Sequence, residues 1–198
     1  MTDLPLETGP LPLGSVNHKG VGWWGILCVI ATEGALFAYL PFSYYYFDVQ
    51  AHASWIPETP KLTLALPDTI VLLASSVAIW WAEKSLKEGR RGRQLLGTAI
   101  AFVLGVIFVA VQYKEWLDKP FTLQTSPYGS LYFTTTGFHM AHVAAGLVGL
   151  LLAFIWSALG YFSPRRYAPF SIAAIYWHFV DAVWLAVFFT YYVTPRLW

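Results

Sequence analysis

Apolar and polar residues alternate along the chain in long blocks. Five strongly apolar stretches are separated by short segments that hold most of the charged residues and prolines. A transmembrane helix needs roughly 20 mainly apolar residues to cross a hydrocarbon core about 30 Å thick. The segments between the stretches carry too many charges and prolines to lie in lipid. We therefore predict an all-α fold, a polytopic membrane bundle with five transmembrane helices at residues 21–47, 68–88, 93–116, 129–162 and 169–193.

The second stretch is the shortest, because only residues 69–82 are free of charge. Asp68 follows Pro67 and is a favourable N-cap for a helix. At the other end, Lys84 and Lys87 can lay their apolar stems along the helix while their ammonium groups stay at the interface. These residues extend the predicted helix over 68–88.

The fourth stretch is the longest. Residues 120–164 contain no Asp, Glu, Lys or Arg, and as one helix they would extend about 67 Å, too long for a single crossing. Ser126 and Pro127 are typical of a helix start. The span is therefore placed at 129–162. The polar residues that precede it, 114–120, are assigned to a wet segment in which the third span ends.

The distribution of Lys and Arg predicts the orientation of the bundle. Five spans place the two termini on opposite sides of the membrane. With a cytoplasmic N-terminus, eight basic residues face the cytoplasm and four face the other side, which is the asymmetry that the positive-inside rule favours. We expect residues 1–20 to be a cytoplasmic tail, 21–198 to be the membrane domain, and the C-terminus to lie on the periplasmic or outer side.

The composition agrees with a membrane protein and excludes several other classes. Of 198 residues, 57% are hydrophobic and 12% are charged, whereas a soluble domain is about 25% charged. The net charge of +1 provides no field for binding nucleic acid. The single cysteine, Cys28, excludes an internal disulfide and a CxxC metal site.

A few ionisable side chains fall inside the predicted spans, where such groups are costly and usually functional. Glu33 lies near the middle of the first span. One interpretation is a neutral carboxyl group that is hydrogen-bonded to a neighbouring helix. The other is a group with a proton-related or lipid-related role. The residues themselves leave both open.

His139 and His142 are three residues apart and share a helix face, as do His178 and Asp181. All four fall near mid-depth, so a metal or haem site is one interpretation. Interhelical hydrogen bonding is the other, with Asp181 satisfying His178 inside its own helix. We favour it because no HExxH or comparable spacing occurs. We therefore predict intramembrane polar packing for these four residues, and neither a metal ligand nor a catalytic residue in this chain.

Small residues line one side of the fourth span. Gly137, Gly146 and Gly149 are interspersed with alanines there. Small side chains allow two membrane helices to approach each other closely. We expect this face to be a helix-packing surface.

Several motifs, taken in order, resemble a known family. The letters YGS at 128–130 and TGFHMAHV at 136–143 resemble the signature YGS…TGFHGLHV of subunit III of haem–copper cytochrome oxidases. The letters YWHFVDAVWL at 176–185 resemble that subunit's final helix, YWHFVDVVWL. Shorter matches lie at 32–33, 68–69 and 120–122, so the resemblance covers residues 23–192.

The resemblance implies an accessory subunit of a hetero-oligomer in aerobic respiration. It would carry no haem or copper, which the catalytic subunit I and subunit II would hold, and it would bind phospholipid and support proton uptake and turnover stability. The resemblance maps the family's carbodiimide-reactive carboxylate onto Glu33 and its polar helix-packing positions onto the three histidines and Asp181. The chain matches the last five helices of the seven-helix form, as bacterial members do, which implies the bacterial cytoplasmic (inner) membrane.

Other functions stay open at this point. The five-helix form also occurs in quinol oxidases and in nitric-oxide-reductase-associated members of the family. A self-sufficient metalloenzyme would use His139, His142 and His178. A proton channel centred on Glu33 would need a continuous polar path, which a single acid in the first span disfavours.

Overall fold

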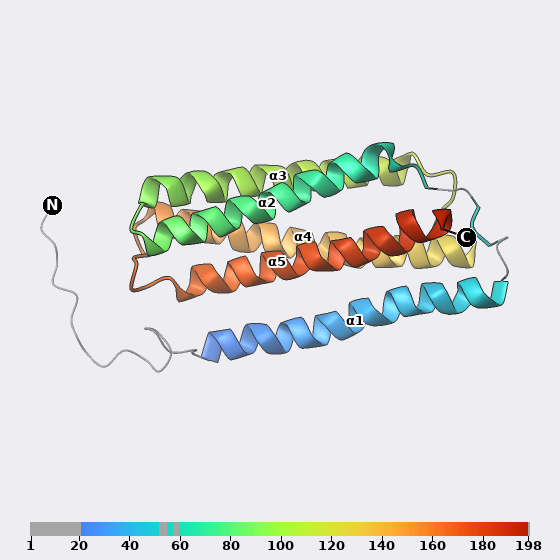
Figure 1. The fold of residues 1–198 in the computed structure, drawn as a ribbon, viewed down its shortest axis with the longest axis horizontal. Helices are drawn as coiled ribbons and strands as arrows, with labels where there is room; N and C mark the ends of the chain where they lie inside the picture. The colour runs from blue at the N-terminus through green and yellow to red at the C-terminus, as the bar shows by residue number, and fades with distance from the viewer. Residues whose placement is uncertain (1–20, 52–54, 58–59, 198) are drawn as a thin grey trace, which may run out of the picture.

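The computed structural model describes residues 21–51, 55–57 and 60–197 as five long helices that run side by side (Figure 1). All five are long and apolar enough to cross a membrane. The predicted all-α, five-helix fold is confirmed, while the predicted tail, residues 1–20, lies outside the described residues. The helices are α1 Val21–Ala51, α2 Leu62–Lys87, α3 Arg91–Leu117, α4 Pro127–Ala158 and α5 Ala168–Phe188, followed by a π-helical turn η1 Phe189–Val193 and a 3₁₀ turn η2 Thr194–Arg196.

Four helices enclose the core, and α1 lies against one side of them. α2 and α4 each pack on both α3 and α5, which closes a four-helix ring. α1 packs mainly on α4 and α5 and is separated from α2 and α3 in Figure 1. In its most apolar window only 11% of the residues are buried by this chain, against 28% or more in the other helices. Much of the α1 surface is therefore left for lipid or another chain.

The start of α2 differs from the predicted span. The helix begins at Leu62, so Pro67 lies inside it and Asp68 is not its N-cap. A proline removes one backbone hydrogen bond, but membrane helices tolerate this where neighbouring helices pack around the gap. Asp68 is consequently buried between helices instead of lying at the aqueous boundary.

The end of α4 also differs from the prediction. The helix starts where Oγ of Ser126 accepts a hydrogen bond from the N–H of Gly129 at 3.1 Å. It ends at Ala158 and not at 162, because Gly160 adopts a φ of +82° and reverses the chain. By contrast, α1, α3, α4 and α5 all begin within two residues of their predicted starts.

Two tryptophans of α5 form the centre of the core. Trp177 and Trp184 are fully buried, and their indole N–H groups donate to the hydroxyls of Ser75 and Thr69 on α2, each at 2.9 Å. A buried indole needs such an acceptor because the membrane interior offers no water. These two bonds set the register of α5 against α2.

Candidate functional site

An acid–imidazole contact joins α1 to α4. Nε2 of His142 lies 3.1 Å from Oε2 of Glu33, and each residue is near the middle of its helix. The side chain of His142 is 16% exposed and that of Glu33 is 33% exposed. The pair therefore lies at the edge of the bundle, where lipid or a partner chain can contact it.

The hydrogen bonds of His142 determine how many protons the pair holds. Nδ1 lies 2.7 Å from the backbone carbonyl oxygen of Phe138, which can only accept, so Nδ1 carries a hydrogen. The contact between Nε2 and Oε2 of Glu33 needs a second hydrogen, carried either by an imidazolium or by a carboxylic acid. In both cases the pair is neutral overall and holds one exchangeable proton between the two side chains.

Aromatic residues hold the imidazole of His142 in place. The ring of Phe37 packs against it edge to face, with the ring centroids 5.0 Å apart. The hydroxyl of Tyr176 donates to the backbone carbonyl of His142 at 3.4 Å. The edge-to-face contact with Phe37 and the contact of Nδ1 with Phe138 together hold the imidazole in the orientation that pairs with Glu33, so the pair is preorganised.

The structure separates the other polar residues that the sequence placed in one layer. His139 is fully buried and stacks on Trp184 with ring centroids 4.9 Å apart, whereas Nδ1 of His178 lies 2.6 Å from Oγ of Ser76. Asp181 is buried without a hydrogen bond to any described residue, so the predicted bond to His178 is wrong. Within the described residues, no three His, Cys, Asp or Glu side chains are close enough to share a metal ion.

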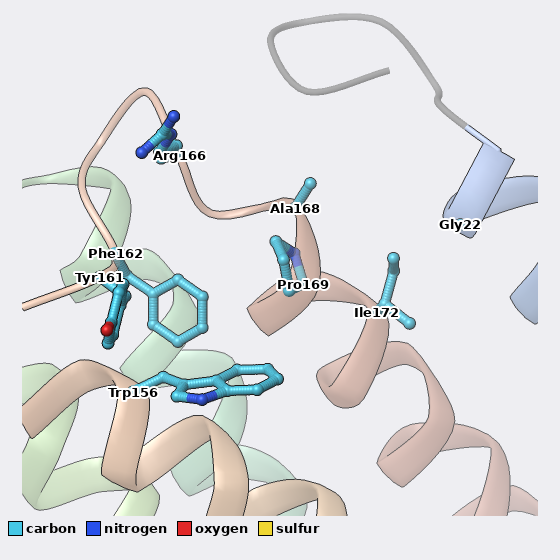
Figure 2. A pocket seen from close by; sticks show the side chains of 8 residues that line it. All are labelled: Gly22, Trp156, Tyr161, Phe162, Arg166, Ala168, Pro169 and Ile172. Carbon is cyan, nitrogen blue, oxygen red and sulfur yellow. The ribbon is translucent and has the colours of Figure 1, made fainter. Parts of the chain in front are cut away.

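A groove runs between α1 and the turn that joins α4 to α5. Two cavities of about 490 and 260 Å³ share Trp156, Phe162, Pro169 and Ile172 in their walls. Figure 2 shows these apolar side chains with Arg166 on the turn beside them. An apolar cavity with a cation at its edge has the chemistry of a site for an acyl chain and its phosphate.

Comparison with known proteins places this bundle among relatives. The family model for cytochrome c oxidase subunit III matches residues 14–195. The chain belongs to the cytochrome c oxidase subunit III family. Human cytochrome c oxidase subunit 3 is 36% identical over 183 residues, which are 88% of this chain and 70% of the human protein. The Drosophila melanogaster protein of the same name is 34% identical over 177 residues, which are 85% of this chain and 68% of the fly protein.

Membership of the subunit III family confirms the resemblance seen in the motifs. The chain is an accessory subunit of a respiratory oxidase, it crosses the membrane several times, and it has partner oxidase subunits. The family carries no redox centre. His178 contacts Ser76, His142 pairs with Glu33 and His139 stacks on Trp184, so the geometry of the described residues gives no support to the alternative of a self-sufficient metalloenzyme.

The three candidate glycines of this subunit III chain have different surroundings. A Cβ at Gly146 would lie 2.8 Å from the ring of Trp177, whereas the position at Gly137 is 3.7 Å from Trp116 and that at Gly149 has no neighbour within 4 Å among the described residues. Gly105 on α3, which the sequence prediction missed, would bring a Cβ within 2.7 Å of Trp177. The sequence shows that a glycine lies in an apolar helix, but it does not show that the indole ring of Trp177 packs against that glycine.

The sequence prediction also missed a buried charge pair at the end of α3. Glu115 and Lys119 belong to the segment expected to be wet, yet their side chains are only 7% and 11% exposed. Nζ of Lys119 lies 2.8 Å from Oε1 of Glu115, which also accepts a hydrogen bond from the hydroxyl of Tyr192 at 2.8 Å. The spacing of opposite charges by four residues was the signal that could have revealed this pair.

Proposed function

We propose that this chain is the accessory subunit of a bacterial haem–copper cytochrome c oxidase. It packs against the catalytic subunit I, in a complex with subunit II, and the haem and copper reside in those partners. The family match over residues 14–195 carries the proposal. The sparsely buried α1 supports it, because its exposed apolar surface suits lipid or a partner helix.

In this proposal the complex lies in the bacterial cytoplasmic membrane with the N-terminus of the chain on the cytoplasmic side. The α2–α3 and α4–α5 connections then share that side, and the C-terminus faces the periplasm. The arginines in or directly beside these two connections support this orientation, since short cytoplasmic loops and the adjoining helix ends are enriched in basic residues. They are Arg90, Arg91, Arg93, Arg165 and Arg166.

Phospholipid in the groove between α1 and the α4–α5 turn is part of the proposed function. An acyl chain lies against Trp156, Phe162 and Ile172, and the phosphate pairs with Arg166. A guanidinium suits this role because it can bind two phosphate oxygens at once. Such a lipid links α1 to the rest of the bundle and keeps the subunit intact during turnover.

Glu33 is the residue that supports proton uptake in this proposal. Its pair with His142 holds one exchangeable proton and lies at the edge of the bundle, where a partner subunit can exchange that proton. The preorganised imidazole keeps the carboxyl group in one position. Net charge in the membrane stays at zero while the proton is held.

Purification of the complex through an affinity tag on this chain tests the proposal. In mild detergent we expect subunits I and II to co-purify, with all haem and copper in those chains and reduced cytochrome c as the electron donor. A chain purified alone with stoichiometric haem or copper would overturn the accessory role. A complex that oxidises quinol but not cytochrome c would replace the proposal by the quinol-oxidase alternative, and one that reduces nitric oxide would replace it by the nitric-oxide-reductase-associated alternative.

A further inference from the structure

Several buried polar side chains with unsatisfied hydrogen-bonding groups lie at the end of the bundle where α2 begins and α3 ends, and three of them, Asp68, Gln112 and Glu115, belong to these two helices. Asp68 is 3% exposed and Gln112 is fully buried. Both carboxylate oxygens of Asp68, both amide atoms of Gln112 and Oε2 of Glu115 have no hydrogen-bond partner among the described residues. Inside a membrane protein each such atom costs several kcal/mol unless something else satisfies it.

Among the described residues, the contacts of this cluster pair only one of its two carboxyl groups with a positive charge. The carboxylates of Asp68 and Glu115 are close enough to interact electrostatically. Lys119 pairs with Oε1 of Glu115, and its Nζ lies 5.1 Å from the ring of Tyr132 and 5.6 Å from that of Tyr192. One ammonium thus compensates one carboxylate, and the second carboxyl group is neutral if it keeps a proton.

A cavity of about 310 Å³ adjoins the cluster. Its walls include Leu64 on α2 and Glu115 on α3. Asp68 lies four residues after Leu64 on α2, and Gln112 lies three residues before Glu115 on α3. Residues at these spacings share a helix face, so Asp68 and Gln112 lie one helical turn deeper in the bundle than Leu64 and Glu115 in the cavity wall. Lys61 and Asp118 are the other charged residues in the wall besides Glu115 and Lys119. The cavity is large enough for several water molecules, each of which occupies about 30 Å³ in the liquid.

We infer that ordered water extends from this cavity to Asp68, Gln112 and Oε2 of Glu115, and that the carboxyl group of Asp68 holds a proton which it exchanges with the aqueous phase through this water. In the exchange the O–H bond of the carboxylic acid breaks and an O–H bond forms on the adjacent water, and the reverse step restores the acid. The inference goes beyond the proposed accessory function. Its site lies on α2 and α3 and is separate from Glu33, which lies on α1.

Infrared difference spectroscopy of the intact oxidase complex tests the proton on Asp68. We expect the wild-type complex to show a protonated carboxyl C=O band that shifts after transfer to D₂O and is missing in the Asp68→Asn complex. Asp118→Asn is the matched control, since Asp118 is exposed in the wall of the same cavity and its loss should leave the band in place. A wild-type spectrum identical to that of Asp68→Asn in this region, or a band that D₂O does not shift, would overturn the inference.

The water itself can be tested without relying on a variant at Asp68. Leu64→Trp narrows the cavity and leaves every polar group in place, so we expect the D₂O shift to slow roughly tenfold, the effect of about 1.4 kcal/mol on the barrier. A high-resolution density map of the wild-type complex should show ordered water in contact with at least two of Asp68, Gln112 and Glu115. Direct bonds from these groups to each other or to a partner chain, with no water between them, would refute the site.

Discussion

Oε2 of Glu33 lies 3.1 Å from Nε2 of His142, and this contact links the outlying helix α1 to the four-helix ring. Polar contacts between membrane helices contribute only about 0.6 kcal/mol on average. The contact is therefore too weak to hold α1 in place by itself. The contact instead holds a proton between the two side chains. Phe37 and the α4 backbone already restrict the position of the imidazole in this pair.

Replacing Glu33 by Gln should remove the exchangeable proton of the pair and keep the packing of α1 against α4. The amide can still donate to Nε2 of a neutral His142, so we expect assembly to be intact and the stability to change by less than about 1 kcal/mol. The exchangeable proton is lost, so proton uptake during turnover, or the lifetime of the working oxidase, should decrease. Proton uptake in vesicles and the number of turnovers before inactivation measure the two effects.

Glu88→Gln is the matched control for this prediction. Glu88 is exposed after α2 and forms a surface pair with Arg90, so its loss should leave both measurements unchanged. If the purified Glu33→Gln complex takes up protons and survives turnover as the wild type does, Glu33 has no proton-related role.

The sequence was sufficient to predict that Glu33 and His142 lie near the middle of long apolar helices, because position along a helix follows from counting residues in an apolar span. It could not predict that they meet, since no local pattern says that α1 packs on α4. The motif at 136–143 indicated the family, but it did not predict that His142 is partly exposed while His139 is fully buried. That difference arises from the direction in which each imidazole leaves α4.

Asp68 shows where local rules misled the prediction. A proline followed by an aspartate is typical of a helix start, but here the helix begins at Leu62 and continues through Pro67. Before Pro67, Ala65 is fully buried and Leu62 packs against the core, whereas Leu64 and Leu66 stay exposed, so the helix is extended past Pro67 by packing on one face only. Predicting this would have required knowledge of how α3 and α5 pack around α2.

Gly146 should tolerate a methyl group far less well than Gly149. In Gly146→Ala the new Cβ would lie 2.8 Å from the ring of the fully buried Trp177. Overpacking of this kind typically costs about 1–3 kcal/mol. We expect a lower yield and a lower melting temperature of the complex, measured by thermal denaturation in detergent.

Gly149→Ala serves as the comparison on the same helix, because no atom of the described residues lies within 4 Å of its Cβ position. Its melting temperature should match that of the wild type. Equal stability of the two alanine variants would show that α4 and Trp177 can separate freely, contrary to the packing described.

The bond from Trp184 to Thr69 should contribute a small, measurable coupling between α5 and α2. The single variants Trp184→Phe and Thr69→Val each remove the 2.9 Å contact, and the double variant removes it only once. A double-mutant cycle on thermal stability should therefore give a coupling of about 0.6 kcal/mol, the average for such bonds in membranes. Strict additivity of the two substitutions would mean that the contact contributes nothing.

Arg166 should determine how much anionic phospholipid stays bound to the complex. It borders the groove beside Trp156 and Phe162, whereas the neighbouring Arg165 does not line either cavity. Arg166→Gln removes the phosphate partner, so native mass spectrometry should find less bound anionic lipid, while Arg165→Gln should retain the wild-type amount. Ile172→Trp fills the acyl part of the groove without changing charge and should lower the retention of phospholipids of any headgroup. If both Arg166→Gln and Ile172→Trp retain lipid as the wild type does, the lipid of this oxidase binds outside this groove.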